Sequence, residues 1–170
     1  MALTLDFQGK LLISLTDGKK LGEIKDVYLD QQASRLVAVY LGKSGLINRK
    51  AQVIDMPLIK LMGVDAWLVT DSETVVVLNE IENSETFLLA DSLRGREIQT
   101  DGGTKIGTVG DIYVDDNCNV KGFVFDKLLV EGPLSETRAI SREAISSLGD
   151  EKSPMIAALD QAEKLKVEIE

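Results

Sequence analysis

The sequence predicts an all-β protein with short helical turns, built as two small barrels in tandem. The main observation is a nine-residue stretch that occurs twice, as GEIKDVYLD at 22–30 and as GTVGDIYVD at 107–115. The second is a series of short branched and aromatic runs, separated by turn signals such as Asp-Gly, which is typical of strands. A length of 170 residues suits two small domains. We expect domains at 1–80 and 86–170, joined by a polar linker at 79–85.

The repeated stretch predicts a β-bulge. Ile24 lies on one face of an ideal strand, whereas Val27 and Leu29 lie on the other, although all three are apolar enough for the core. One extra residue near Lys25 would bring them into phase, and the second copy has Gly110 at the matching position. We expect a bulge in both copies, and it would bend the strand, as a small closed barrel requires.

The residues that coincide in the two copies are a glycine, two aspartates and a tyrosine. Paired carboxylates could perform acid–base chemistry. Because a structural repeat duplicates residues that determine the fold, whereas an active site is usually built once, we favour hydrogen bonding to backbone N–H groups freed by the bulge and turn. The structural repeat motif comprises Gly22, Asp26, Tyr28, Asp30, Gly107, Asp111, Tyr113 and Asp115.

The other elements follow from apolar runs and from the repeat. Short helical turns are expected within 56–62 and 141–148, at matching places in the two copies. The segment after Pro154 contains helix formers, but the repeat equates 155–157 with a strand at 67–69, so we expect a strand at 155–158 with a helix as the alternative. The remaining strands are predicted at 3–7, 10–15, 36–41, 75–78, 93–98 and 120–125.

Composition restricts the class of partner. The formal charge is −9, from 28 acids and 19 bases, and it argues against nucleic acid as the main partner because phosphate binding requires clustered Lys and Arg. It favours a basic protein partner. No apolar run reaches the ~18 residues of a membrane span, and a single cysteine, Cys118, suits a cytoplasmic location. There is no histidine, which removes the commonest general base and metal ligand. We expect no cofactor, no metal and no catalytic residue.

One segment imitates a calcium loop. Asp115, Asn117 and Asn119, followed by Asp126, approximate the oxygen spacing of an EF-hand, but Val120 stands where the sharp turn needs glycine. A hairpin turn rich in Asp and Asn explains the same residues. The glycines form no phosphate-binding loop, and the carboxylates near the lone cysteine oppose thiol reactivity.

Two groups of residues are candidates for interaction. Lys43, Arg49 and Lys50 form the only notable basic loop, which a solvated loop would also explain. Phe123 and Phe125 lie on a strand whose two faces are both largely apolar, so one barrel core can cover only one face.

We expect the two phenylalanines on the uncovered face of that strand. This assignment follows if Val120, Gly122 and Val124 point into the barrel. The aromatic face would then meet the other copy, a second chain or an unrelated protein.

Each copy, with its G-x-[IV]-x-D-[VI]-Y-[LV]-D stretch, its following strand and its segment ending in glycine (54–63 or 140–149), resembles the PRC-barrel family. The resemblance implies two SH3-like barrels of about six strands, each serving for docking and assembly without a shared catalytic set. Family members include the cytoplasmic domain of the H subunit of the photosynthetic reaction centre and the C-terminal domain of a ribosome maturation factor.

The expected function is therefore a non-catalytic scaffold for protein–protein assembly, not an enzyme. Its partner is a protein of unknown identity, and a homodimer is one form that this assembly could take. One alternative is a ribosome maturation or RNA-processing factor that binds a basic ribosomal protein. Another is an accessory protein for photosynthetic complex assembly or electron transfer. A third is an enzyme or metal-dependent binder that uses the aspartates.

Overall fold

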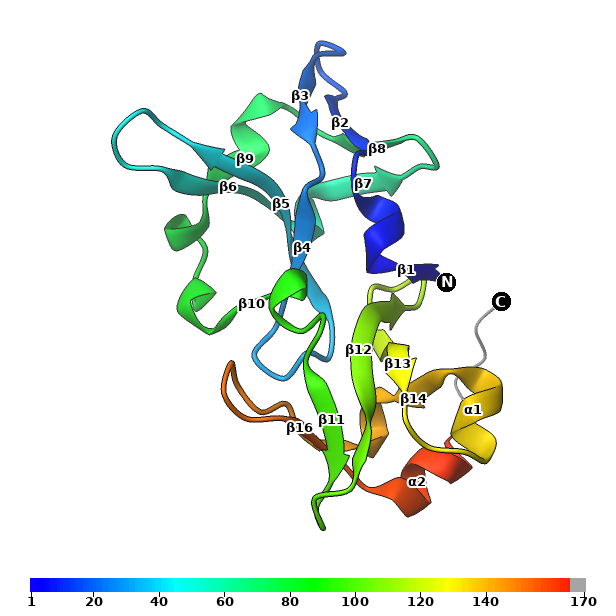
Figure 1. Ribbon diagram of the computed structural model, residues 1–170. Helices are drawn as coiled ribbons and strands as arrows, with labels where there is room; N and C mark the ends of the chain where they lie inside the picture. Colours follow the sequence, from blue (N-terminus) through cyan, green and yellow to red (C-terminus); the bar gives the residue numbers. More distant parts are fainter. Residues whose placement is uncertain (166–170) are drawn as a thin grey trace. The chain divides into compact units, whose positions relative to one another are not determined.

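The computed structural model describes residues 1–165, which fold into two compact units that do not follow the order of the chain (Figure 1). The first unit contains Asp6–Gln31 and Leu36–Leu89. The second contains Met1–Leu5, Gln32–Arg35 and residues 90–165. This division differs from the expected boundaries, 1–80 and 86–170. The opening strand of each repeat pairs with a strand of the other repeat.

The first unit consists of two sheets whose strand pairs are mostly antiparallel. One has the strand order β10-β4-β5-β6-β9 and the other has the order β3-β2-β8-β7. Strands β3 and β4 are consecutive pieces of the repeated stretch, so this stretch joins the two sheets. The strands are β2 (Leu11–Ser14), β3 (Lys20–Glu23), β4 (Asp26–Leu29), β5 (Leu36–Ser44), β6 (Lys50–Asp55), β7 (Ile59–Met62), β8 (Ala66–Val69), β9 (Val75–Val77) and β10 (Leu88–Leu89).

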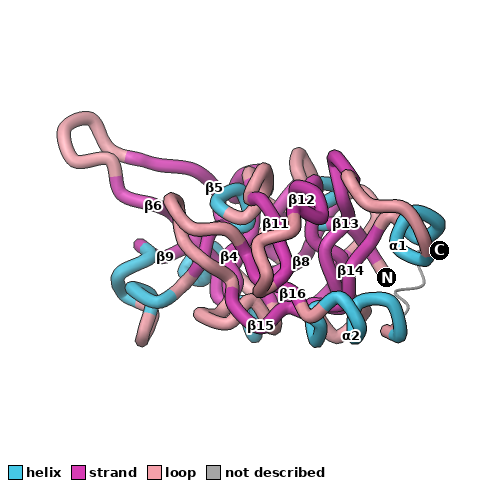
Figure 2. Tube along the Cα trace, turned by 60° about the horizontal axis from the view of Figure 1, so that its bottom comes forward, coloured by secondary structure: helices cyan, strands magenta, loops and turns pink. Residues whose placement is uncertain are grey.

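The second unit has one sheet, in the order β14-β13-β12-β11-β16-β15, with β1 added to β12. Two short helices pack together at one end of this unit (Figure 2). Its elements are β1 (Ala2–Leu3), β11 (Glu97–Thr100), β12 (Lys105–Val114), β13 (Val120–Leu128), α1 (Pro133–Thr137), β14 (Ala139–Ser141), β15 (Ile145–Ser147), β16 (Met155–Ala157) and α2 (Leu159–Lys164).

The two units repeat the same pairing. Strand β2 runs parallel to β8, and β11 runs parallel to β16, whereas the neighbouring pairs are antiparallel. Single 3-10 turns occupy Met56–Leu58 and Arg142–Ala144, inside the two predicted helical turns. After Pro154 the chain forms a strand and then a helix, so both readings of this segment occur in succession. The predicted all-β fold of two tandem barrels is confirmed.

The predicted bulge is present in the second copy. The register of β12 against β13 shifts between Val109 and Asp111, which leaves Gly110 unpaired. A Cβ on Gly110 would lie 2.8 Å from the backbone nitrogen of Asp126, closer than real Cβ contacts. Glycine is therefore required by the close approach of the two strands.

In the first copy the strand breaks instead of bulging. Residues Ile24 and Lys25 separate β3 from β4, although the Lys25 N–H still donates to the Tyr40 carbonyl oxygen at 2.8 Å. Lys25 stands at the position of Gly110, and it lies between two strands instead of within a bulge. The break has the same effect as a bulge, since Ile24, Val27 and Leu29 are all fully buried.

Each repeat donates its opening strand to the unit built by the other repeat. Strand β1 precedes the first repeat, yet Leu3 pairs with Tyr113 in the second unit. Strand β10 opens the second repeat, yet Leu89 pairs with Tyr28 in the first unit. Leu3 and Leu89 are equivalent in the repeat, 86 residues apart, so the exchange is reciprocal.

The donated strands cover the apolar face that a barrel core leaves open. In the second unit, Leu3 and Val124 pack on a cluster of Tyr113 and Ala139. In the first unit, a cluster of Tyr28, Ala38 and Val53 is covered mainly by the segment that joins the repeats. The covering residues are Val37, Tyr40, Val76, Leu78, Ile81, Phe87 and Leu89. The expected linker, 79–85, is thus packed against the first unit through its single apolar side chain, Ile81.

Candidate docking surfaces

Asp111, one of the repeated aspartates, anchors the start of the chain in the second unit. Its side chain is buried, and its oxygens accept hydrogen bonds from the Thr4 hydroxyl at 2.6 Å, the Leu5 N–H at 3.1 Å and the Ile112 N–H at 2.7 Å. The Arg94 Nε lies 3.5 Å from Asp111 Oδ1, and Arg94 Nη2 donates to the Thr4 hydroxyl at 2.8 Å. Because these donors occupy the carboxylate, the arrangement suits structure rather than proton transfer.

Asp115 organises the turn between β12 and β13. It accepts hydrogen bonds from the backbone N–H groups of Asn117 and Asn119, both at 2.9 Å, and from the Asn119 amide at 3.1 Å. Burial alone would raise the pKa of Asp115, but these hydrogen bonds outweigh it and lower the pKa below its ordinary value. Burial and then the charge of Asp115 raise the pKa of Cys118. Within residues 1–165, no three or more Asp, Glu, Cys or His side chains form a group that could hold a metal.

Phe123 and Phe125 are buried, at 0% and 3% exposed, so the expectation that they form an uncovered face is wrong. Phe125 lies against Gly107, where a Cβ would come within 2.9 Å of its ring. The neighbouring Val124 is only partly buried and belongs to the face covered by Leu3. The larger side chains occupy the interior because they bury more apolar area there than valine or glycine would.

Lys43, Arg49 and Lys50 lie on the hairpin of β5 and β6, which projects from the first unit (Figure 1). Their side chains form no ion pair and no hydrogen bond with any residue of 1–165. At the tip of the same hairpin, Leu46 and Ile47 are 103% and 94% exposed. Sequence reasoning found the three cations but missed the apolar tip, although the turn residues on either side, glycine and asparagine, signal an apex.

Strand β7 forms a second apolar surface on the first unit. It is the last strand of its sheet, and no strand of residues 1–165 pairs with its outer side. Leu61 and Met62 on the strand are exposed, as are Leu58 before it and Val64 after it. Sequence reasoning treated this segment only as repeat structure, because one sequence does not show which side of a strand lacks a neighbour.

The equivalent edge of the second unit is polar. Strand β15 occupies the same position, and Ser146 and Ser147 are exposed there. The Ser146 hydroxyl donates to the Ile156 carbonyl oxygen at 3.2 Å, and Arg142 Nη1 donates to the Ile145 carbonyl oxygen at 3.0 Å. The two edges therefore share a backbone position and differ in the chemistry that they present.

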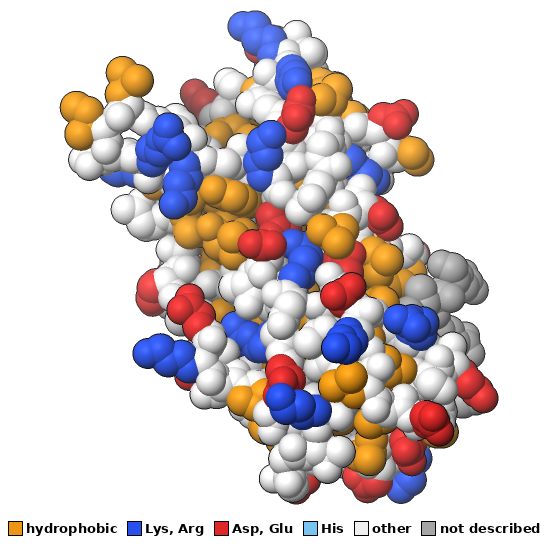
Figure 3. Space-filling model, viewed as in Figure 1, with side chains coloured by type: hydrophobic (Ala, Val, Ile, Leu, Met, Phe, Trp, Pro, Cys, Tyr) orange, Lys and Arg blue, Asp and Glu red, His pale blue; other side chains and the backbone are white. Residues whose placement is uncertain are grey.

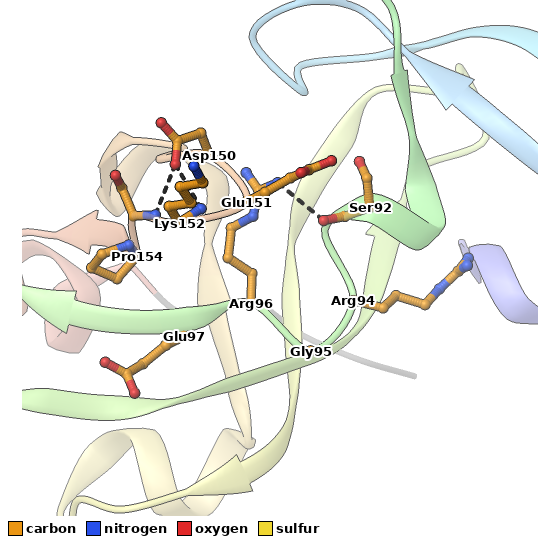
Figure 4. A pocket seen from close by; sticks show the side chains of 10 residues that line it. Ser92, Arg94, Gly95, Arg96, Glu97, Asp150, Glu151, Lys152 and Pro154 are labelled. Carbon is orange, nitrogen blue, oxygen red and sulfur yellow. Dashed lines mark hydrogen bonds between the residues drawn. The ribbon is translucent and has the colours of Figure 1, made fainter.

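A polar pocket of about 470 Å³ lies in the second unit beside the turn before β16 (Figure 4). Arg96 donates to the carbonyl oxygens of Leu148 and Ser92, and burial lowers its pKa although the nearby Asp150 and Glu151 oppose this. Hydrogen bonds, first from the Lys152 N–H, lower the pKa of Asp150. Arg96 and Asp150 are thus engaged with backbone groups, and these hydrogen bonds hold the turn in place.

The comparison with known families identifies both repeats. The model of the PRC-barrel domain matches residues 6–76 and again residues 85–152. No curated protein matched the chain. None of the helices within residues 1–165 is long and apolar enough to cross a membrane.

Proposed function

The chain belongs to the PRC-barrel domain family, and we propose that it is a non-catalytic scaffold that binds another protein through the β7 edge of its first unit. The observation that supports the proposal is the row of exposed apolar side chains along an edge strand. The same edge of the second unit, at β15, is polar. The absence of catalysis is supported by Asp111 and Asp115, whose carboxylates are engaged in structural hydrogen bonds.

An edge strand offers a specific mode of binding. The outer edge of β7 can receive an extended segment of a partner, which adds a strand to the sheet. Pockets on the partner would then receive Leu61 and Met62, which alternate between the two faces of the strand. Burying half-exposed side chains of this size contributes on the order of 1 kcal/mol each, so the edge supplies a recognisable part of an ordinary protein interface.

Site-specific crosslinking tests the proposal. A photoreactive amino acid is placed at Leu61 and, as the matched control, at Ser147 in the second unit, and the crosslinked proteins are identified by mass spectrometry in cells that express the chain. We expect one dominant partner at Leu61 and none at Ser147. The identity of that partner would also separate a ribosomal protein from a photosynthetic component or a second copy of this chain.

A binding measurement with the purified partner completes the test. The double variant Leu61→Ser/Met62→Ser should weaken binding at least tenfold, because each serine removes most of the apolar area that the partner buries. Both side chains are exposed, so the variant should unfold at the same temperature as the unmodified protein. Unchanged binding by a folded variant would refute the assignment of this edge.

A further inference from the structure

The tip of the β5–β6 hairpin lies beyond the body of its sheet. The last paired residues are Ser44 and Lys50, whereas β9 accompanies β6 only as far as Gln52. The apex therefore extends as a two-stranded ribbon that no third strand of residues 1–165 supports. Leu46 and Ile47 at this apex are fully exposed, and Figure 3 shows hydrophobic side chains there with basic side chains behind them.

The hairpin is also the cationic region of an acidic chain. Residues 31–54 contain no Asp or Glu, and the apolar tip is flanked by Lys43 before it and by Arg49 and Lys50 after it. Without these three cations the formal charge of the chain would be −12 instead of −9. Apolar and cationic groups are thus combined in one short segment, while the acidic groups lie elsewhere.

We propose that this hairpin is a peripheral membrane anchor whose tip inserts Leu46 and Ile47 into a bilayer that carries anionic headgroups. The acyl boundary of a bilayer accepts aliphatic side chains, and the phosphates directly above it attract Lys and Arg. The distribution of these groups along the hairpin follows that order, with apolar residues at the tip and cations behind it.

Two other classes of partner fit the hairpin less well. A protein would need a deep pocket to cover both faces of a projecting tip, whereas a fluid bilayer closes around it. Single-stranded nucleic acid is usually bound with aromatic side chains that stack on bases, and residues 42–54 contain no aromatic residue. An anionic lipid surface can bind both the apolar tip and the cations of the hairpin.

The charge distribution also determines how the chain would approach a membrane. An anionic surface repels the acidic remainder of the chain and attracts only the hairpin, so the tip arrives first. Two aliphatic side chains and three cations support reversible binding, with an association constant comparable to the roughly 10⁴ M⁻¹ of a single myristoyl chain.

Vesicle sedimentation tests the proposal with the full chain. Vesicles of equal parts phosphatidylglycerol and phosphatidylcholine should bind the protein at about 0.1 M salt, and pure phosphatidylcholine vesicles should not. The variant Lys43→Gln/Arg49→Gln/Lys50→Gln should lower the association constant about 100-fold, because each cation is attracted independently to the anionic surface. The variant Leu46→Ser/Ile47→Ser should lower it about tenfold, since it loses the inserted apolar area.

A matched control separates this proposal from the proposed function. The variant Leu61→Ser/Met62→Ser alters the β7 edge and should leave vesicle binding unchanged, just as the hairpin variants should leave crosslinking at Leu61 unchanged. All these residues are exposed, and circular dichroism checks that each variant is folded. Failure of either proposal is therefore recognisable without reference to the other.

Fluorescence reports insertion directly. The variant Ile47→Trp places an indole at the tip, and the native Trp67 is buried, so a change on adding vesicles comes from position 47. We expect a shift to shorter wavelength with anionic vesicles and quenching by brominated acyl chains. No vesicle binding, or binding that persists unchanged in both hairpin variants, would overturn the proposal. Binding of single-stranded RNA without vesicle binding would assign the hairpin to nucleic acid instead.

Discussion

The two repeats differ most in the connection between β5 and β6 in the first unit and between β13 and β14 in the second. In the first unit, β5 and β6 continue as a paired ribbon to Ser44 and Lys50, and the apex exposes Leu46 and Ile47. In the second unit, the chain leaves β13, turns at Gly132 and forms α1, where Leu134 is buried. This connection thus exposes two apolar side chains, Leu46 and Ile47, in the first repeat, whereas its apolar side chain Leu134 is buried in the second.

The same asymmetry extends to the whole surface. Of the ten large hydrophobic side chains exposed within residues 1–165, seven belong to the first unit. Only Met1, Leu5 and Leu129 belong to the second unit. The residues common to both copies are therefore those that shape the backbone, whereas the residues that could recognise a partner are concentrated in one copy.

The largest expected effect tests how the second unit holds the start of the chain. Asp111→Ala removes a buried acceptor and leaves Arg94 and the Thr4 hydroxyl without it. We expect a loss of about 3 kcal/mol in the free energy of unfolding, measured with urea, because the buried Arg94 keeps only an exposed carboxylate, Asp91, as its ion-pair partner. Equal stability of the variant would mean that the hydrogen bonds from Thr4 and Leu5 to Asp111 do not stabilise the second unit.

A neighbouring aspartate provides the control for this prediction. Asp116 also contacts the start of the chain, through an ion pair of 2.7 Å with the terminal ammonium, but its side chain is exposed. Asp116→Ala should cost less than about 0.5 kcal/mol, since exposed ion pairs contribute little. A large loss here would indicate that the ammonium, and not Asp111, fixes the first residues.

The next effect compares the motif glycines of the two copies. A Cβ at Gly107 would lie 2.2 Å from the Lys127 carbonyl oxygen, whereas a Cβ at Gly22 would meet only the flexible end of Leu41 at 3.1 Å. Gly107→Ala should therefore lower the free energy of unfolding by about 2 kcal/mol, and Gly22→Ala by less than about 1 kcal/mol. Urea unfolding of the two variants checks this, and equal losses would contradict it.

Sequence reasoning succeeded where the information is repeated, whereas the local alternation that predicted a strand at 3–7 was wrong, since Thr4–Phe7 forms a 3-10 helix. The duplicated motif predicted the two barrels, and the phase conflict around Lys25, with Gly110 at the matching position, predicted the bulge that the second copy has. The exchange of β1 and β10 could not be predicted, because each strand has only two residues and its partner lies far away in the sequence. No periodicity can be read from two residues.

The interaction surfaces show the same limit. Both faces of β13 are apolar, so alternation alone could not decide whether Phe123 or Val124 points inward. The exposure of Leu61 depends on β7 being an edge strand, which is a property of the sheet and not of the segment. Only the cations of the hairpin could be found from the sequence, because charged residues remain exposed in almost any fold.

The smallest effect concerns Asp115 and depends on pH. The hydrogen bonds from Asn117 and Asn119 lower the pKa of Asp115 below 3.8, so the folded state binds the proton more weakly than the unfolded state does. The stabilisation is therefore complete above pH 3.8 and is lost as the pH falls through the lowered folded value. Asp115→Ala should cost about 1 kcal/mol at neutral pH, and this difference should shrink in acid.

The variant Asp115→Asn separates charge from hydrogen bonding in this turn. It keeps an acceptor for the backbone N–H groups of Asn117 and Asn119 but cannot ionise, so it should lose less stability than Asp115→Ala at neutral pH. Its remaining loss should shrink in acid, because Asp115 of the unmodified protein is then protonated and also lacks the charge. Urea unfolding at neutral pH and below pH 3.8 measures both variants. If the Asp115→Ala difference were the same at both pH values, the ionised carboxylate would not be what holds the second hairpin turn. The turn would then depend on its local backbone conformation.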